Sequence, residues 1–487
     1  MSAKLAAAAA AACALIAGAL PRAAIAAPPA APAQAEPAPA DTRELGAGRF
    51  GIVHVYVPAG TPQSVAIFVS GDGGWELGVV NMAHALRVMG AVVIGVDVTH
   101  YFASLRKAAQ RADAHCEMIA ADLESLSHQV QRQIGLREYQ VPVLIGYSSG
   151  ATLVYAALAQ SPPGTFAGAL SLGFCPDQDF AGAQLCPGSG LRYSQNAQHE
   201  LVLEPATHLR EPWIALQGEK DEVCDPHVTE AFAARVTGGA VVKLPLVGHG
   251  FSVERNWMPQ FQAAYRRLAA RPPPPAVAAP EISDLPLHEV HAAGPAQEFA
   301  LLLTGDGGWA GLDQELAARL AANGIPTVAL NSLKYFWTRR TPDQTAQDVA
   351  RVMRHYLSAW HAQRVLMIGY SFGADVLPFV MNRLPPELRA RVASVSLLGI
   401  DAHASFEVHV AEWVAADEGG PPTRPELAEL SGIPVLCIYG EGESDSICPQ
   451  MPEGTVTREQ IGKGHHFSGE YALLAERILS FTRSNSR

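Results

Sequence analysis

The stretch RVLMIGYSFGADVLPF, residues 364–379, decides the fold. A continuous apolar run leads into the pentapeptide Gly-x-Ser-x-Gly, and a helix-like run follows it. A short apolar run of this kind is typical of a strand covered on both faces. In a nucleophile elbow, the turn between such a strand and a helix exposes the serine hydroxyl above the edge of the sheet. The stretch therefore predicts an α/β protein with Ser371 as a nucleophile, and the alternative is a tight turn with an inert serine.

The same pentapeptide occurs earlier in the chain, as GYSSG at residues 146–150. Five blocks recur in one order: VSGDGGW (69–75) and LTGDGGW (303–309), THYFA (99–103) and LKYFW (333–337), VLIGYSSGA (143–151) and VLMIGYSFGA (365–374), GEKDEVC (218–224) and GEGESDSIC (440–448), GHGFS (248–252) and GHHFS (464–468). The separation between matching blocks is nearly constant, so the sequence predicts a duplicated domain.

Two segments rich in Ala and Pro have the composition of spacers rather than of core elements. The predicted organisation is a signal peptide over 1–26, an Ala/Pro-rich spacer over 27–48, an N-terminal α/β-hydrolase-like domain over 49–270, a Pro-rich linker over 271–284 and a C-terminal α/β-hydrolase domain over 285–487. Apolar runs alternate with helix-like segments in each domain, which predicts two mostly parallel, doubly wound sheets. Such sheets bind ligands at the carboxyl ends of their strands.

The N-terminus has the pattern of a secretory signal. Lys4 precedes an apolar run at 5–20, and small residues at 24–26 suit cleavage after Ala26. The alternative is an uncleaved membrane anchor. The formal net charge of the 487 residues is −12 and no basic stripe occurs, which argues against nucleic-acid binding. We therefore expect a periplasmic protein, with a weak preference for cationic over anionic partners.

Six cysteines follow the predicted signal segment, and an exported protein meets an oxidising compartment. Cys437 and Cys448 are the one possible pair within the C-terminal domain, so we expect them to form a disulfide. The pairing of the other four is not readable, and buried unpaired cysteines are the alternative. The chain has no Cys-x-x-Cys motif, and we expect neither a metal nor a cofactor.

A serine needs a base and an acid, and in this fold they follow it in the order acid, histidine. Asp445 lies just after an apolar run, and His465 follows the next one. We predict Asp445 as the acid and His465 as the base. His466 is an adjacent rival for the base, and the rivals for the acid are Glu441, Glu443 and Asp401.

The oxyanion hole needs two N–H groups directed at the reacting oxygen. We expect one from Phe372 and the other from the loop GDGGW, where Gly307, Gly308 and Trp309 remain open as donors. Asp306 in this loop either braces it or faces a cationic substrate group.

The N-terminal copy contains the same residue types, Ser148, Asp221 and His249, and these match Ser371, Asp445 and His465 in the internal alignment. The copies differ beside the site. At the positions of Phe372, Asp375 and Trp337, the N-terminal copy has Ser149, Thr152 and Ala103, respectively. We expect catalysis in the C-terminal copy, and leave the N-terminal set open as a second site or a structural support.

These features resemble the AcvB/VirJ family of exported bacterial proteins. The resemblance rests on TGDGGWAGLD (304–313), LKYFW (333–337), GYSFGADVLPF (369–379) and GKGHHF (462–467), together with the signal-like N-terminus. It is strongest over 285–487, and the two-domain layout resembles the longer, AcvB-type member.

The resemblance implies a periplasmic, virulence-associated hydrolase of lysyl-phosphatidylglycerol. It implies release of lysine and phosphatidylglycerol by Ser371, His465 and Asp445, without a cofactor. It also implies an aminoacylated phospholipid at the membrane surface as the substrate, with secretion-system proteins as candidate partners. Asp306, Asp375 and Glu441 are candidates for binding the lysyl group, and Trp309 is a further substrate-binding candidate.

Two other functions remain open. One is a serine hydrolase of another ester, a thioester or a peptide. The other is a non-catalytic binding or assembly factor of a secretion apparatus. Similarly, the aromatic run Tyr335, Phe336 and Trp337 either meets lipid or packs in the core.

Overall fold

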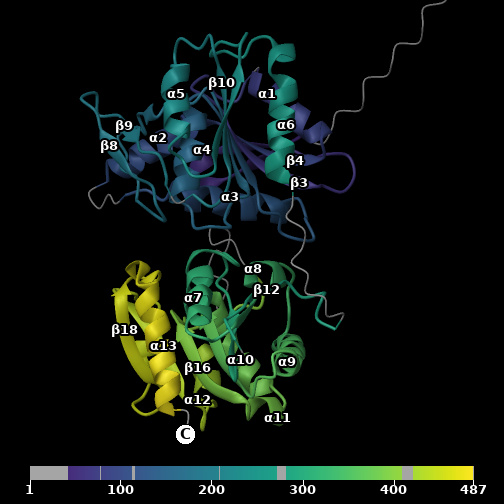
Figure 1. The fold of residues 1–487 in the computed structure, drawn as a ribbon, viewed down its shortest axis with the longest axis vertical. Helices are drawn as coiled ribbons and strands as arrows, with labels where there is room; N and C mark the ends of the chain where they lie inside the picture. Colours follow the sequence, from purple (N-terminus) through teal and green to yellow (C-terminus); the bar gives the residue numbers. More distant parts are fainter. Residues whose placement is uncertain are drawn as a thin grey trace, which may run out of the picture. The chain divides into compact units, whose positions relative to one another are not determined.

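The computed structural model describes residues 42–76, 78–111, 116–207, 209–270, 281–294, 296–408 and 420–485. The predicted signal segment, most of the spacer and most of the linker lie outside these residues. The described chain forms two sheets, each with its own helices, coloured purple to teal and green to yellow in Figure 1. No helix among the described residues has both the length and the apolar character needed to cross a membrane.

The N-terminal sheet is mostly parallel. Its strand order is β1 (Thr42–Gly46), β2 (Ile52–Tyr56), β4 (Ala91–Val96), β3 (Ser64–Val69), β5 (Val143–Tyr147), β6 (Gly168–Leu172), β10 (Trp213–Gly218) and β11 (Gly239–Leu244). Only β2 runs antiparallel to its neighbours, and all pairs from β4 to β11 are parallel. A small antiparallel sheet is inserted between β6 and β10, formed by β7 (Asp177–Gln178), β9 (Leu201–Leu203) and β8 (Tyr193–Gln195).

Helices cover both faces of this sheet, which explains why its central strands β3, β4, β5 and β6 are mostly apolar and buried. One face packs against α1 (Gly78–Val88) and α6 (Met258–Ala269). The other packs against α2 (Val98–Ala109), α3 (Ile119–Gln133), α4 (Ser149–Gln160) and α5 (Pro226–Ala233). Short 3-10 turns lie at Gly48–Phe50 and Glu254–Asn256.

The C-terminal sheet repeats this arrangement without an equivalent of β1. Its order is β12 (Leu287–Val290), β14 (Thr327–Leu330), β13 (Glu298–Leu303), β15 (Arg364–Tyr370), β16 (Val392–Leu398), β17 (Val435–Glu441) and β18 (Thr457–Lys463). Here β12, in the place of β2, is antiparallel to its neighbour and the remaining pairs are parallel. The predicted class, two tandem α/β-hydrolase-like domains with mostly parallel sheets, is confirmed.

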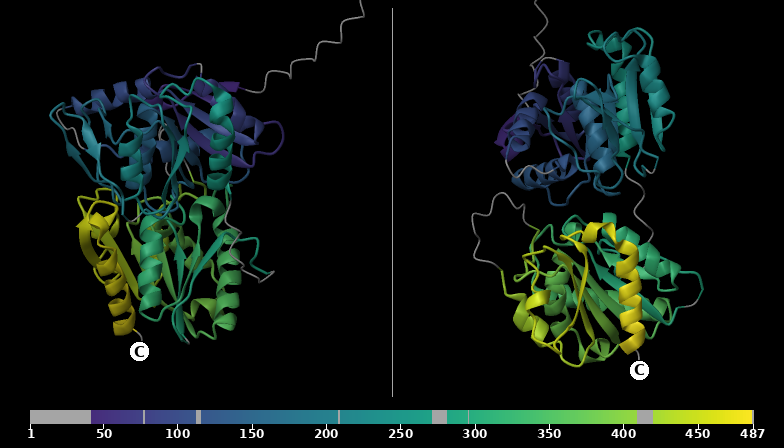
Figure 2. Two further views of the ribbon diagram at one scale, coloured as in Figure 1. Left: turned by 45° about the horizontal axis from the view of Figure 1, so that its top comes forward. Right: turned by 90° about the vertical axis from the view of Figure 1, so that its left-hand side faces the viewer.

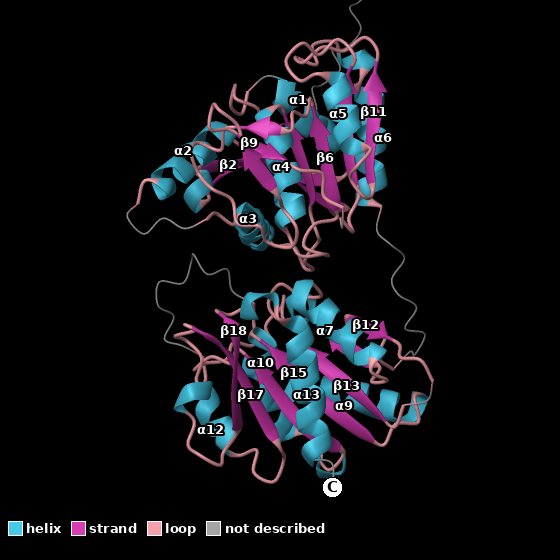
Figure 3. Ribbon diagram, turned by 60° about the vertical axis from the view of Figure 1, so that its left-hand side comes forward, coloured by secondary structure: helices cyan, strands magenta, loops and turns pink. Residues whose placement is uncertain are grey.

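Helices also cover both faces of the second sheet. One face packs against α7 (Gly311–Ala322) and α13 (Tyr471–Asn485), and Figure 3 shows α13 lying along the strands. The same helix is the long yellow one in the right panel of Figure 2. The other face packs against α8 (Ser332–Tyr335), α9 (Pro342–Ala359), α10 (Phe372–Arg383), α11 (Pro386–Arg389) and α12 (Thr423–Ala428). Short 3-10 turns lie at Cys448–Gln450 and Phe467–Gly469.

Local sequence signals explain where α9 begins. Thr341 and Gln344 form a capping box, and Pro342 occupies the first turn. Val349 and Met353 of this helix are buried, as their helical spacing predicts.

Two predicted boundaries differ from the structure. Thr42–Gly46, inside the predicted spacer, forms β1 and pairs antiparallel with β2, so the folded domain begins before residue 49. Ile282, inside the predicted linker, is fully buried in the C-terminal core. Composition does not show where strand pairing and burial begin.

Three disulfides join the six cysteines of the described chain. Cys437 pairs with Cys448, which confirms the prediction. In the N-terminal domain the pairs are Cys116–Cys186 and Cys175–Cys224. Each bridge joins two cysteines of the same domain, and disulfides of this kind are typical of proteins in oxidising compartments.

Candidate active site

Ser371 sits on a sharp turn between β15 and α10. Its backbone angles are φ 50° and ψ −121°, in a region that side chains rarely occupy. Close packing around the turn requires the two glycines of the pentapeptide. A Cβ atom at Gly369 would lie 2.5 Å from the carbonyl oxygen of Gly373, and one at Gly373 would lie 2.1 Å from that of Leu303. This geometry is that of a nucleophile elbow.

His465 is the base that contacts this serine. Its Nε2 atom lies 2.7 Å from Ser371 Oγ, so the hydroxyl can donate its proton to the imidazole. The rival, His466, instead has its Nδ1 atom 2.8 Å from the hydroxyl of Tyr370. The structure therefore favours His465 over His466 as the partner of Ser371.

The acid beside His465 is Glu443, and the prediction of Asp445 is wrong. Glu443 Oε1 lies 2.5 Å from His465 Nδ1, and the Glu443 side chain is 5% exposed. Asp445 is exposed, and its carboxylate accepts a hydrogen bond from the Ser444 hydroxyl. Glu441, another rival, faces Lys463 at 3.3 Å.

The distance from the end of the strand explains this correction. In both copies the acid stands three residues after a glycine, Asp221 after Gly218 and Glu443 after Gly440. Both glycines end up against the backbone of the histidine loop, where a Cβ atom would lie 2.3 Å and 2.1 Å from a carbonyl oxygen. The glycine thus fixes the start of the acid loop, and the two extra residues of the C-terminal copy follow the acid instead of preceding it.

The electrostatics support a working histidine–carboxylate pair. The hydrogen bond with Glu443 is the main cause that raises the pKa of His465. The charges of Glu443, Asp306 and Asp401 raise it as well, whereas burial opposes the shift. Burial works against ionisation of Glu443, but bonds from His465 and the Gly440 N–H lower its pKa overall. The carboxylate is therefore charged and stabilises an imidazolium.

The glycine-rich loop GDGGW passes directly beside the nucleophile. A Cβ atom at Gly305 would lie 3.2 Å from the Tyr370 ring, a tight contact, and 3.6 Å from Ser371 Cβ, so glycine at this position lets the loop lie close against the elbow without crowding the ring. Gly308 is wrong as a predicted oxyanion donor, because its N–H already donates to the Gly305 carbonyl at 3.0 Å and closes a turn. Gly307 and Trp309 in this loop and Phe372, the first residue of α10, remain the candidate donors.

The remaining loop residues have different roles. Trp309 stacks on His288, with ring centroids 5.0 Å apart and an interplanar angle of 10°, which favours a bracing role over a substrate contact. Asp306 is exposed on the loop. Phe336 is fully buried against Phe372, with ring centroids 4.9 Å apart, so this aromatic packs in the core.

A pair of carboxylates lies next to the triad. The Asp401 N–H donates to Asp375 Oδ1 at 2.8 Å, which ties the loop after β16 to α10. Burial, followed by the charges of Asp401, Asp306 and Glu443, raises the pKa of Asp375 well above its usual range, and the Asp401 bond opposes this only in part. Asp375 is thus a positioning carboxyl, whereas Asp401 and Asp306 are exposed and available to a ligand.

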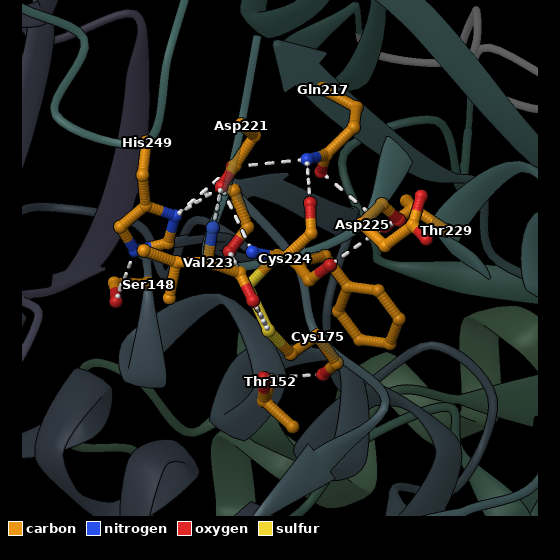
Figure 4. The surroundings of a disulfide bond; sticks show 12 residues. Ser148, Thr152, Cys175, Gln217, Asp221, Val223, Cys224, Asp225, Thr229 and His249 are labelled. Carbon is orange, nitrogen blue, oxygen red and sulfur yellow. Dashed lines mark hydrogen bonds and ion pairs between the residues drawn. A yellow bond between two sulfur atoms is a disulfide. The ribbon is translucent and has the colours of Figure 1, made fainter. Parts of the chain in front are cut away.

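The N-terminal domain contains a complete second triad (Figure 4). Ser148 Oγ lies 2.9 Å from His249 Nε2, and His249 Nδ1 lies 2.9 Å from Asp221 Oδ2. Ser148 has the same strained angles, φ 54° and ψ −120°. Burial raises the pKa of Asp221. Hydrogen bonds from His249 and from the N–H groups of Cys224 and Val223 together lower it by more than burial raises it, so the pKa of Asp221 lies below its ordinary value.

A metal does not fit this second site. Asp221, Cys224 and His249 bring ligand-type atoms within 4.8 Å of one another. However, the Cys224 sulfur is bonded to Cys175, and the carboxylate and imidazole bond each other. A disulfide sulfur is not the thiolate ligand that such a site needs.

Comparison with solved structures finds α/β serine hydrolases. An α/β serine hydrolase without lid from Xanthomonas campestris is 20% identical, with a TM-score of 0.31, over 49% of this chain and 99% of that chain. The esterase domain of a Rhodothermus marinus protein is 15% identical, with a TM-score of 0.32, over 47% and 97%. A serine hydrolase homologue from Coxiella burnetii is 16% identical, with a TM-score of 0.32, over 47% and 97%. No curated protein matches the chain.

Comparison with protein families gives a specific result. The family described as bacterial virulence protein (VirJ) matches residues 63–168 and 297–486, well over half of the chain. The two matched regions contain Ser148 in the first and Ser371, Glu443 and His465 in the second. With one elbow in each matched region, the chain belongs to the VirJ family of bacterial virulence proteins.

Proposed function

We propose that the C-terminal domain is a serine hydrolase that cleaves the aminoacyl ester of lysyl-phosphatidylglycerol in the periplasm. The observation that carries the proposal is the continuous relay from Ser371 Oγ through His465 to Glu443, with distances of 2.7 Å and 2.5 Å. A serine with this partner pair attacks carboxylic esters.

The chemistry follows from the positions of the groups. Ser371 Oγ attacks the lysyl carbonyl carbon while its proton passes to His465 Nε2. The tetrahedral oxyanion lies between the Phe372 N–H and an N–H of the GDGGW loop. Collapse expels the glycerol hydroxyl of phosphatidylglycerol, which takes the proton from His465. Water, activated by the same histidine, then releases lysine and restores Ser371.

The acidic surroundings support a cationic substrate. Asp306 and Asp401 are both exposed, and both act electrostatically on His465. A lysyl ester has an α-ammonium group next to the scissile carbonyl and an ε-ammonium group at the end of its side chain, and exposed carboxylates near the triad are suitable partners for them. Membership of a virulence family and the signal-like N-terminus are consistent with a bacterial envelope lipid.

One feature of the sequence and one of the structure support the proposed periplasmic location. The segment 5–26 has the pattern of a secretory signal, and the six later cysteines form three disulfides. Because the family match is to a bacterial virulence protein, secretion-system proteins remain proposed partners.

Release of free lysine from purified lysyl-phosphatidylglycerol tests the proposal. We expect Ser371→Ala to lower the rate by about 10⁴-fold or more, and Ser148→Ala, the matched variant of the other elbow, to leave it within twofold. Loss in Ser148→Ala alone would move the activity to the N-terminal domain. Absence of lysine release by folded wild-type protein would reject this substrate and favour another ester or a binding role.

The same assay tests the acidic subsite. We expect Asp401→Asn to raise KM for lysyl-phosphatidylglycerol by about fivefold to tenfold, with little change for the neutral ester p-nitrophenyl acetate. An equal effect on both substrates would mean that Asp401 acts on the fold of the loop and not on the ammonium group.

A further inference from the structure

We infer that the N-terminal domain contains a second active serine hydrolase site, Ser148–His249–Asp221, whose substrate is a neutral ester with an apolar acyl chain. The inference does not depend on the function proposed for the C-terminal site. It rests on the geometry of the second triad, on the groups that replace the neighbouring carboxylates, and on the apolar side chains around the two loops that carry the acid and the base.

The proton relay of this site is complete and firmly held. Four groups donate to the Asp221 carboxylate: His249 Nδ1–H, the side-chain amide of Gln217 at 3.0 Å, and the N–H groups of Val223 and Cys224 at 3.0 Å and 2.8 Å. The acid is buried, and the His249 side chain is 18% exposed, so a substrate can still reach the imidazole side. A relict triad would have no need of this degree of organisation.

A disulfide stands where the C-terminal site has a carboxylate. Gly173 and Gly399 occupy equivalent positions, each with positive φ and each packed against the ring of its histidine. Two residues further on, Cys175 takes the place of Asp401. Cys175 is bonded to Cys224 and so ties this loop to the acid loop (Figure 4).

The helix after the elbow changes in the same way. Thr152 takes the place of Asp375, and its hydroxyl donates to the Cys175 carbonyl at 2.7 Å. The tie between helix and loop is thus kept while both carboxyl groups are lost. Asp72 keeps the place of Asp306 in the glycine-rich loop, but Cys175 removes the charge of Asp401. The site therefore has less negative charge to attract a cationic group, which favours a neutral substrate.

The loops around the triad carry exposed apolar side chains. Val223 follows the acid and is 68% exposed, and Leu246 and Val253, on either side of His249, are 63% and 44% exposed. Leu246 and Val253 also line a partly open pocket of about 190 Å³, together with Gly248 and Gly250, which flank His249 in the chain. Large apolar side chains left exposed on the loops that carry the acid and the base are suitable for binding an apolar chain.

The reaction balances within the groups present and water. Ser148 Oγ attacks the ester carbonyl carbon and its proton passes to His249 Nε2. The C–O bond to the alcohol breaks, and the alcohol leaves with that proton. Water then attacks the acyl-serine, gives its proton to His249, and the carboxylic acid leaves as Ser148 regains its hydrogen.

The test uses the full chain with Ser371→Ala, so that the C-terminal nucleophile is absent. We expect a fluorophosphonate reagent to add one group to this variant, at Ser148 by peptide mass spectrometry, and none to the variant with both Ser148→Ala and Ser371→Ala. We also expect Ser371→Ala to hydrolyse p-nitrophenyl octanoate with a kcat/KM at least about tenfold above that for p-nitrophenyl acetate. Circular dichroism confirms that each variant is folded.

A surface variant tests the apolar class of the substrate. Leu246→Ser in the Ser371→Ala background should lower the octanoate-to-acetate ratio by about threefold or more. Val88→Ser is the matched control, since Val88 is 80% exposed at the end of α1, and it should leave the ratio unchanged.

Two outcomes would overturn the inference. A folded Ser371→Ala variant that is neither labelled nor more active than the double variant would mean that Ser148 is inert. Labelling at Ser148 with no preference for octanoate over acetate would reject the apolar substrate class. Lysine release by Ser148→Ala is measured separately, so failure here and failure of the function proposed for Ser371 are distinguishable.

Discussion

Replacing Glu443 by Gln separates the acid of the C-terminal site from its sequence neighbour Asp445. Glu443 Oε1 lies 2.5 Å from His465 Nδ1, and its side chain is 5% exposed, so Gln occupies the same space without the charge. The imidazolium that forms in the transition state then has no buried counter-charge, and the amide can hold the wrong tautomer. Loss of the acid in serine triads lowers kcat by about 10⁴-fold, which corresponds to about 5 kcal/mol of transition-state stabilisation.

The expected result for Asp445→Asn is very different. Asp445 is exposed and bonds Ser444, so we expect its kcat to stay within about twofold of wild type. Both variants are made with Ser148→Ala, so that the N-terminal site does not contribute, and initial rates are measured with lysyl-phosphatidylglycerol and p-nitrophenyl acetate. A Glu443→Gln variant within tenfold of its parent, or an Asp445→Asn variant that loses as much, would refute the reasoning.

The pH dependence and the packing of the elbow give two further predictions. His465 accepts the serine proton only when neutral, and its pKa is raised above 6.5, so kcat/KM should rise with pH through a midpoint above that value. The residual activity of Glu443→Gln should have a lower midpoint, and an unchanged midpoint would contradict the assigned pair. Gly150→Ala should lower the free energy of unfolding by about 2 kcal/mol or more, because the added Cβ would lie 2.3 Å from the Ser70 carbonyl oxygen. Gly78→Ala, with open space around it, should cost nothing in thermal or urea unfolding.

Much of the fold follows from short local patterns. The elbow needs a buried strand, glycines at fixed offsets and a helix, and all of these are readable from residues 364–379. Two copies of that pattern in one order predict two sheets of one kind, and the strand orders agree with this. Where β1 and β12 begin depends instead on pairing with distant strands, which composition does not encode.

The acid of the C-terminal triad is the residue at which the sequence pattern misleads most. Matching Asp445 to Asp221 followed residue identity and the shared cysteine, and put the two-residue insertion on the wrong side of the acid. The better guide was the glycine at the end of the strand, because backbone contact with the histidine loop fixes its position. Glu443 is one methylene longer than Asp221 and occupies an equivalent place against its histidine.

The oxyanion loop shows a different limit. Glycines in GDGGW signal unusual backbone angles, but the sequence does not say which N–H is used within the loop. Gly308 closes a turn onto Gly305, and Gly74 closes the equivalent turn onto Gly71. Only the fold separates an N–H that holds the loop from one that faces the substrate.

The two proposed sites would let a duplicated domain change its specificity while keeping its mechanism. In both copies a side chain on the helix after the elbow bonds the backbone of the loop beside the histidine, through Asp375 in one and Thr152 in the other. This bond sets the position of the loop, so either chemistry supports the nucleophile. What changes is the charge that the substrate meets, since Asp401 is replaced by a cysteine in a disulfide. Loss of function would more simply remove the serine or the histidine, so the retained relay and the altered surroundings favour two hydrolases with different substrates.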